Sequence, residues 1–275
     1  MMRDGPAMAR LINALQPWRE KLVLVGGWAH RLHRLHGDAE VPQYQAVVTR
    51  DADLAFDVVG EMGGDIAKAL ELAGFANTLS GDHVPPVSHF QFGEEDTGFY
   101  AEFLTPLHGS GIRRDGTDDA TVAVAGVIAQ KLRHLEVLLV APWRLTLTPT
   151  EELPVVDNTE ILVVNPVSFI AQKLLIHHLR VGRKKAQDIL YIHDTIELFE
   201  ANLQRLQALW REKVGPSLTA NQRSTTVAQA SVLFENISDT IREATRTPVD
   251  RTINPTELRL RCELGLTALF ADSTT

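Results

Sequence analysis

The spacing of hydrophobic and polar positions changes near residue 165. Before that point, short apolar runs typical of strands alternate with segments whose apolar residues recur at helical spacing. LVLVGG, residues 22–27, predicts a buried strand that ends at paired glycines, and WAHRLHRLHG predicts the helix that follows. From about residue 166 onward, nearly every segment has helical spacing. The pattern predicts an α+β fold, with a mixed α/β domain at residues 1–165 and an all-helical domain at residues 166–275.

Two further regions of the mixed domain have apolar runs, one typical of a hairpin and one of ambiguous period. The runs SHFQFG and FYAEFLTP predict strands on either side of an acidic loop, an arrangement suited to a hairpin. AGVIAQKLRHLEVLLV, residues 125–140, predicts helical or mixed structure, because its apolar residues fit more than one period.

The stretch VVTRDADLAFDV, residues 47–58, alternates carboxylates with apolar side chains. In a strand, residues two apart share a face, so Asp51, Asp53 and Asp57 are expected on one face and the apolar residues on the other. Two aspartates separated by one residue repel each other across about 6–7 Å, and a divalent cation relieves that repulsion. Mg²⁺ prefers carboxylate oxygens and keeps waters for a phosphate substrate. An exposed edge strand with a solvated acidic face gives the same pattern, so both interpretations stay open.

Gly26 and Gly27 favour the metal interpretation. Glycines between a strand and a helix let backbone amides approach a phosphate closely, and the helix start attracts an anion. Tight turns also need glycine for steric reasons, so the pair alone indicates little. Its position about 25 residues before the paired aspartates is more specific, because the glycine turn offers anion binding and the aspartate strand offers metal binding.

Together these motifs resemble the nucleotidyltransferase superfamily with the polymerase-β-like fold. In that pattern, a strand, a Gly-Gly or Gly-Ser turn and a helix precede a strand bearing Asp-x-Asp, and a third acid comes from a later strand. The chain has LVGGWA, TRDADLAF and then Glu102 in FYAEFLTPL. It is similar in particular to AbiEii-type toxins and related uncharacterised bacterial nucleotidyltransferases, over about residues 20–195. The resemblance implies a polymerase-β-like mixed sheet with helices, followed by the helical C-terminal domain.

The resemblance also implies an activity. An acceptor oxygen would attack the α-phosphate of a nucleoside triphosphate such as ATP, and pyrophosphate would leave; the acceptor would be an RNA (tRNA), a protein or a small molecule. The expected catalytic residues and ligands of Mg²⁺ or Mn²⁺ are Asp51, Asp53 and Glu102. The expected nucleotide-binding residues are Gly26, Gly27, Trp28, Thr49, Arg50, Lys173, Arg183, Lys184, Lys185 and Asp188. The likeness to toxins further implies a toxin–antitoxin pair, with an antitoxin as a partner.

Two positions depart from the superfamily pattern. Where many members have Gly-Ser, this chain has Gly26-Gly27, so the hydroxyl that would touch a terminal phosphate is missing, although the AbiEii relatives are similar in this respect. The third acid is Glu102 rather than aspartate, which lengthens its reach by one methylene. Neither departure excludes catalysis.

Basic residues gather near the boundary between the predicted domains. We expect Lys173 and one or more of Arg183, Lys184 and Lys185 to hold the triphosphate. Asp188 would orient Lys184 or Lys185, or assist the acceptor. A helix pair with a solvated basic face is the alternative. Trp28 has two interpretations as well, since it would either stack on a base or pack into the core.

The run HRLHRLH places His30, His33 and His36 three residues apart, over roughly 120° of a helix. A zinc site would need a fourth ligand, and the sequence offers none nearby. A polar helix face beside the site is the preferred interpretation. The single cysteine, Cys262, is expected in the core or at its boundary.

Composition narrows the functional classes. The net charge of −8 over 275 residues argues against coating nucleic acid by bulk electrostatics. Without a window of roughly 20 apolar residues or a signal-peptide pattern, the sequence predicts a cytoplasmic protein and no membrane partner. Two other functional classes stay open: a non-catalytic relative that binds nucleotide or RNA, and a metal-dependent phosphoesterase, which would release no pyrophosphate.

Overall fold

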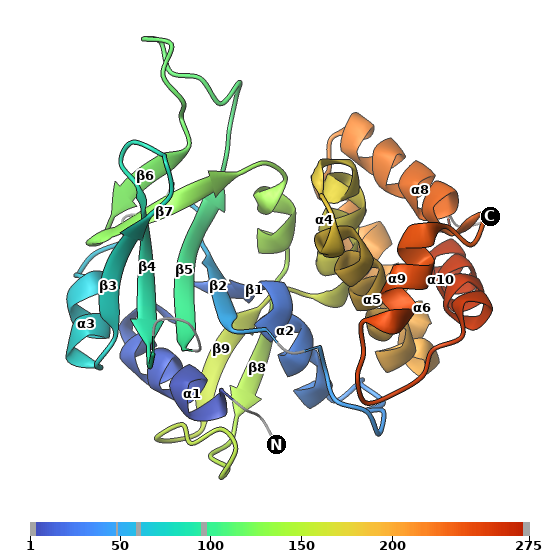
Figure 1. Cartoon of the computed structure of the whole chain (residues 1–275), viewed down its shortest axis with the longest axis horizontal. Coiled ribbons are helices and arrows are strands. Elements are labelled where there is room, and N and C mark those ends of the chain that lie inside the picture. Colours follow the sequence, from blue (N-terminus) through green and yellow to red (C-terminus); the bar gives the residue numbers. More distant parts are fainter. Residues whose placement is uncertain (1–3, 48, 59–61, 95–97, 272–275) are drawn as a thin grey trace. The chain divides into compact units, whose positions relative to one another are not determined.

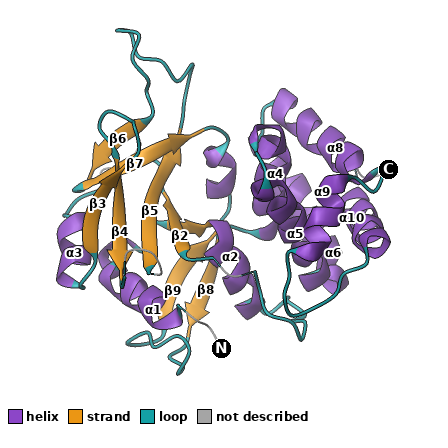
Figure 2. Ribbon diagram, viewed as in Figure 1, coloured by secondary structure: helices purple, strands orange, loops and turns teal. Residues whose placement is uncertain are grey.

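The computed structural model describes residues 4–47, 49–58, 62–94 and 98–271 (Figure 1). The chain divides into two compact units: unit 1 is Met1–Ala29 with Val48–Val164, and unit 2 is His30–Val47 with Asn165–Thr275. Strands gather in unit 1 and helices in unit 2 (Figure 2). The boundary of two folding domains at residue 165 stays a prediction, and the compact units differ from it because residues 30–47 cluster with the helices.

A nine-stranded mixed sheet organises the described part of unit 1. Its strands run in the order β3-β4-β5-β2-β1-β9-β8, while β7 pairs with β5 and with β6. The strands are β1 (Val23–Val25), β2 (Asp51–Ala55), β3 (Ala76–Ser80), β4 (Val87–Phe92), β5 (Phe99–Pro106), β6 (Thr121–Val124), β7 (Val127–Leu132), β8 (Trp143–Leu147) and β9 (Thr159–Val163). The predicted hairpin is confirmed, because β4 and β5 pair antiparallel. The segment at residues 125–140 forms β7 and a 3₁₀ turn, Leu135–Leu139, instead of a regular helix.

Alternating burial explains how β2 and β5 sit in the sheet. Ala52 and Leu54 of β2 are buried, as are Ala101 and Phe103 of β5, whereas the residues between them are half-exposed. The prediction that Asp57 belongs to this strand is wrong. β2 ends at Ala55, which is the last residue opposite β1 and β5, so Asp57 lies beyond the paired strand and is exposed.

Capping and helix-breaking residues mark several ends of the helices in unit 1. They are α1 (Gly5–Ala14), the start of α2 (Gly26–Leu32) and α3 (Ile66–Leu72). α1 ends before Pro17, whose ring cannot donate a backbone hydrogen bond, and the chain continues as the 3₁₀ turn Gln16–Trp18. Asp65 caps α3 by accepting from the backbone N–H of Lys68.

Unit 2 is helical, with α4 (Pro166–Ile176), α5 (Arg183–Leu198), α6 (Leu203–Leu209), α7 (Gly215–Ser217), α8 (Ala220–Phe234), α9 (Asp239–Arg246) and α10 (Pro255–Phe270). Asn165 caps α4, and Pro166 occupies its first turn, as the sequence predicted. α10 lies against α5 at Gly265, where a Cβ would come within 2.4 Å of Ile196 Cγ2, so only glycine permits this approach. Cys262 is buried, as expected. The α+β fold, with its helical C-terminal region, is therefore confirmed.

Candidate active site

Three acidic residues share one face of two neighbouring strands. β2 and β5 are parallel, and their register places Asp53 opposite Glu102 and Asp51 opposite Tyr100. Register partners in adjacent strands point to the same side of a sheet. The apolar neighbours of these residues are buried on the other side, so the carboxylates of Asp51, Asp53 and Glu102 project from one half-exposed face. The sequence predicted each strand face, and the pairing of β2 with β5 brings the two faces together.

The glycine turn lies against this acidic face. Val25, the last residue of β1, pairs with Asp53, and Gly26 follows with a φ of +67°. A Cβ at residue 26 would come within 2.0 Å of Asp53 Oδ2. Glycine is therefore required both for the backbone conformation and for the close approach of the Asp53 side chain. This structural requirement exists whether or not Gly26 and Gly27 also bind a phosphate.

Trp28, by contrast, belongs to the core. Its side chain is fully buried and makes an edge-to-face contact with Phe99, with ring centroids 5.9 Å apart. A buried ring cannot stack on a nucleotide base, so the structure favours the packing alternative for this residue. Thr49 is also buried, whereas Arg50 is exposed, and the carbonyl oxygen of Arg50 accepts from the backbone N–H of Tyr100.

The structure adds two residues to the acidic face. His89 of β4 lies opposite Glu102, and its Nε2 donates to Oε1 of Glu102 at 2.8 Å. The imidazole stacks on the Tyr100 ring at 5.4 Å, with 9° between the planes. The bond to Glu102 raises the pKa of His89. Burial, followed by repulsion from Asp51, Glu102 and Asp53, raises the pKa of Tyr100 to about 12, so its phenol stays protonated at neutral pH.

Lys173 and Asp188 form a buried ion pair in unit 2. Nζ of Lys173 donates to Oδ1 of Asp188 at 2.6 Å, and Nε of Arg180 donates to Oδ2 at 3.0 Å. The ammonium also lies 4.6 Å from the ring centroids of both Phe169 and Tyr191. The expectation that Asp188 orients Lys184 or Lys185 is therefore wrong, because both of its oxygens are held by other cations. Fifteen residues separate Lys173 from Asp188, and only the packing of α4 against α5 brings them together.

The remaining predicted basic residues lie in the first turn of α5. Arg183 and Lys184 are exposed, and Lys185 is half-exposed. Their side chains can meet an anion from solvent without rearrangement of the helix. The structure thus separates the predicted cationic group into one buried, paired lysine and three accessible residues.

The histidine run forms part of the core of unit 2. His30 and His33 are buried, and the His30 ring stacks on Phe169 at 5.8 Å and meets Tyr191 edge-on at 4.9 Å. The expectation of a polar helix face is therefore wrong for these two residues. Among the described residues, neither ring nitrogen of His30 has a hydrogen-bond partner, and burial lowers the pKa of His30 to about 3. The packing of Phe169 and Tyr191 against the imidazole accounts for its burial.

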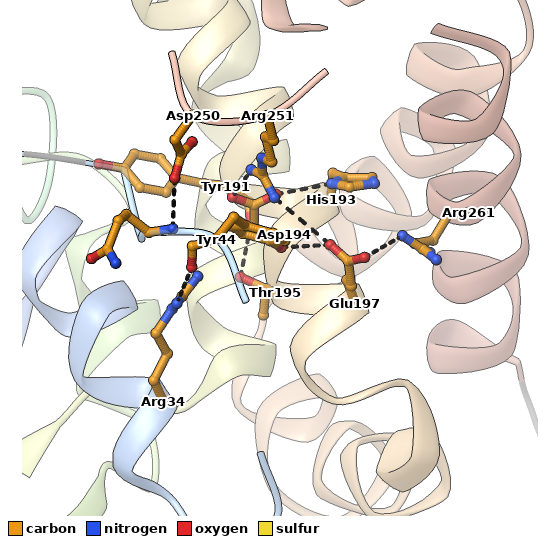
Figure 3. Close-up of polar contacts among 11 residues, drawn as sticks. Arg34, Tyr44, Tyr191, His193, Asp194, Thr195, Glu197, Asp250, Arg251 and Arg261 are labelled. Atoms are coloured by element: carbon orange, nitrogen blue, oxygen red, sulfur yellow. Dashed lines mark hydrogen bonds and ion pairs between the residues drawn. The ribbon is translucent and has the colours of Figure 1, made fainter. Parts of the chain in front are cut away.

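A second acidic group in unit 2 was not foreseen from the sequence. His193, Asp194 and Glu197 each place a ligand atom within 4.8 Å of the others (Figure 3). Both carboxylates already have cationic partners: Arg251 donates to Asp194 at 2.6 Å, and Arg261 donates to Glu197 at 2.7 Å. A metal ion would have to displace at least one guanidinium. We therefore interpret this group as an ion-pair network that connects α5 to α10 and to the Arg251 segment.

The fold and the acidic face together define a class of enzyme. A strand, a glycine turn and a helix, with paired aspartates on one adjacent strand and a third acid on the next, make up the nucleotidyltransferase arrangement. The nucleotidyltransferase family model matches residues 4–215. The chain belongs to this family.

Comparison with solved structures finds a distant match. The chain is similar to MenT4, a nucleotidyltransferase toxin from Mycobacterium tuberculosis H37Rv, with 14% sequence identity and a TM-score of 0.42. The similarity covers 98% of this chain and 83% of MenT4. Comparison with curated proteins gives no match. Within the described residues, no helix is long and apolar enough to cross a membrane.

Proposed function

We propose that the protein is a metal-dependent enzyme that transfers a nucleoside monophosphate from a nucleoside triphosphate to an acceptor and releases pyrophosphate. The observation that carries this proposal is the register of Asp53 with Glu102 in adjacent parallel strands, with Asp51 on the same face. Three half-exposed carboxylates on one face repel one another unless a cation or a proton intervenes.

The donor set fits a hard divalent cation. Carboxylate oxygens are the ligands that Mg²⁺ and Mn²⁺ prefer, and Asp51, Asp53 and Glu102 offer them at a half-exposed face that solvent and a phosphate can reach. When bound, the metal would neutralise phosphate charge and lower the pKa of the acceptor. The packing of Asp53 against Gly26 restricts where that carboxylate can point, which orients one ligand before the cation arrives.

The proposed reaction is a displacement at phosphorus. The acceptor hydroxyl loses its proton to solvent, and its oxygen forms a bond with the α-phosphorus. The bond between that phosphorus and the oxygen bridging to the β-phosphate breaks, and its electron pair leaves with pyrophosphate. In unit 2, Arg183, Lys184 and Lys185 are proposed to bind phosphate groups, and their exposure supports this role for Arg183 and Lys184. In unit 1, Gly26, Gly27, Thr49 and Arg50 are proposed to bind the nucleotide, and exposure supports this role for Arg50.

We propose a positioning role for the buried pair. Asp188 accepts from both Lys173 and Arg180, and these ion pairs hold the second turn of α5 directly after the turn that carries the exposed basic residues. Lys173 is also proposed to help hold the triphosphate. The residue is 5% exposed, and its ammonium already has an anionic partner in Asp188.

The acceptor is proposed to be a tRNA or another RNA, a protein or a small molecule, and the protein is proposed to act in the cytoplasm as a toxin that an antitoxin neutralises. The sequence resemblance to AbiEii-type toxins supports both statements. Incubating the protein with each α-³²P-labelled nucleoside triphosphate, Mg²⁺ and either total tRNA or a cell extract tests the activity and identifies the acceptor.

Asp53→Asn is the control for that assay. Label incorporated by the wild-type protein but not by Asp53→Asn, with release of pyrophosphate, supports the proposal. Release of inorganic phosphate without pyrophosphate would indicate a phosphoesterase. Binding of labelled nucleotide without turnover, tested over several metals and acceptors, would indicate a non-catalytic nucleotide- or RNA-binding relative.

A further inference from the structure

Glu102 has a partner on the side away from the aspartates. β5 lies between β2 and β4, so Glu102 has Asp53 as its register partner on one side and His89 on the other. Nε2 of His89 and Oε1 of Glu102 are 2.8 Å apart, and both side chains are partly buried, with exposures of 29% and 22%. The hydrogen bond occupies one of the two carboxylate oxygens and leaves Oε2 for another ligand.

The imidazole is itself held in place. Its ring stacks on Tyr100 at 5.4 Å with nearly parallel planes, and β4 is bound to β5 by an antiparallel ladder from His89 to Phe92. Rotation of the imidazole would break the stacking contact and the bond to Glu102 together. The N–H is therefore presented to Glu102 from a fixed direction.

The hydrogen bond from His89 restricts the additional rotatable bond that the extra methylene gives Glu102. A glutamate side chain has one more rotatable bond than an aspartate, and fixing that bond in a metal-binding rotamer costs conformational entropy. A hydrogen bond that already fixes the rotamer before the cation binds removes part of this cost. Partners of metal ligands that act in this way change metal affinity by about 10–100-fold when they are removed.

We propose that His89 is a positioning residue that holds Glu102 in the rotamer in which Oε2 binds the divalent cation. The inference rests on the proposed function, because it assumes that Glu102 is a metal ligand. His89 would not contact the nucleotide or the acceptor, and its effect would pass through Glu102 alone. The structure thereby assigns a role to the β4 strand, which no motif in the sequence connects with the acidic face.

The test measures Mn²⁺ binding by the full-length protein without nucleotide, from the electron paramagnetic resonance signal of the free ion. His89→Leu, which removes the donor, is expected to weaken Mn²⁺ binding about 10–100-fold. His89→Gln, whose side-chain amide can donate from a similar position, is expected to stay within a few-fold of wild type. Gln91→Leu is the matched control, because Gln91 lies two residues along the same face of β4 and opposite Tyr100 instead of Glu102; it is expected to bind Mn²⁺ as wild type does.

A double-mutant cycle separates positioning from a general effect on the sheet. If His89 acts through Glu102, then His89→Leu has no further effect on Mn²⁺ affinity once Glu102→Gln is present. Melting curves in the presence of EDTA show whether each variant is folded. Should His89→Leu fail to fold, His89→Asn takes its place, since the asparagine amide is too short to reach Glu102, and the same loss is expected.

The Mn²⁺ measurements distinguish an incorrect role for His89 from an incorrect metal site. Mn²⁺ affinity that is lost in Asp53→Asn but unchanged in the folded His89→Leu or His89→Asn protein would overturn the role of His89 and leave the metal site intact. Additive effects of His89→Leu and Glu102→Gln would also overturn it. Wild-type protein that binds Mn²⁺ no better than Asp53→Asn would overturn the metal site itself, and the role of His89 with it.

Discussion

Gly26 and Asp53 approach so closely that a single added Cβ on residue 26 would lie 2.0 Å from Oδ2 of Asp53. The relationship connects the two motifs that the sequence presents about 25 residues apart, because β1 and β2 are paired at Val25 and Asp53. The glycine turn and the paired aspartates are thus one structural feature, so a substitution in one motif should displace the side chains of the other.

Gly26→Ala should destabilise the protein and displace Asp53. The φ of +67° alone disfavours alanine by about 1–3 kcal/mol, and the contact with Asp53 adds to that cost. Urea unfolding measures the loss. Gly37→Ala is the control, since among the described residues no atom outside Gly37 and its two chain neighbours lies within 4 Å of a Cβ built there; it should change the free energy of unfolding by less than about 0.5 kcal/mol. Equal stability of the two variants would contradict the steric interpretation.

Asp53→Asn should reduce nucleotide transfer by about 100-fold or more while leaving the melting temperature unchanged or slightly raised. The reason is that the half-exposed carboxylate contributes metal-binding charge and repels its neighbours in the metal-free protein. Asp57→Asn provides a matched control, because Asp57 is exposed beyond the end of β2. Transfer by Asp53→Asn at the level of Asp57→Asn would exclude the proposed mechanism.

Lys173→Ala should cost about 3 kcal/mol of stability, because it leaves the buried Asp188 carboxylate with Arg180 as its remaining cation. Adding Asp188→Asn should recover part of that loss, since the unpaired charge is then gone. Lys184→Ala, at an exposed position in the next helix, should change stability by less than about 0.5 kcal/mol and weaken triphosphate binding instead. Thermal melting and nucleotide titration of the three variants distinguish these effects. A Lys173→Ala protein as stable as wild type would mean that the pair contributes little.

The stability of unit 2 should depend on pH through His30. In the folded protein burial lowers the pKa of His30 from 6.5 to about 3, so between these values the unfolded chain takes up a proton that the folded protein does not. This difference lowers the free energy of unfolding as pH falls below about 6.5, by up to about 1.4 kcal/mol per pH unit. His30→Phe, which keeps an aromatic ring beside Phe169 and Tyr191, should remove this part of the acid sensitivity.

The measurement for His30 compares urea unfolding at pH 7 and pH 5.5 for both proteins. The wild-type protein should lose about 1 kcal/mol more than His30→Phe over that interval. His178→Phe, the same substitution at an exposed position of unit 2, is the matched control. Identical pH dependence in the wild-type and His30→Phe proteins would show that His30 takes up its proton in the folded state.

Local patterns in the sequence were sufficient for much of the fold and for the three carboxylates. Period-two alternation determined that Asp51 and Asp53 share a face and that Glu102 shares one with Tyr100, because side chains alternate along any extended strand. Capping residues determined helix starts such as that at Pro166. These features depend on a few neighbouring residues, so the sequence specifies them independently of the tertiary contacts.

The tertiary structure decided which faces meet and which polar residues are buried. The alternation in β4 and β5 does not specify that His89 lies opposite Glu102; the antiparallel register does. The helical spacing around Lys173 and His30 fits a solvated face or a buried one, and the packing of Phe169 and Tyr191 around both side chains buries them. Burial and register depend on contacts between residues far apart in the chain, and the free energy of those contacts exceeds the local preferences that a sequence pattern displays.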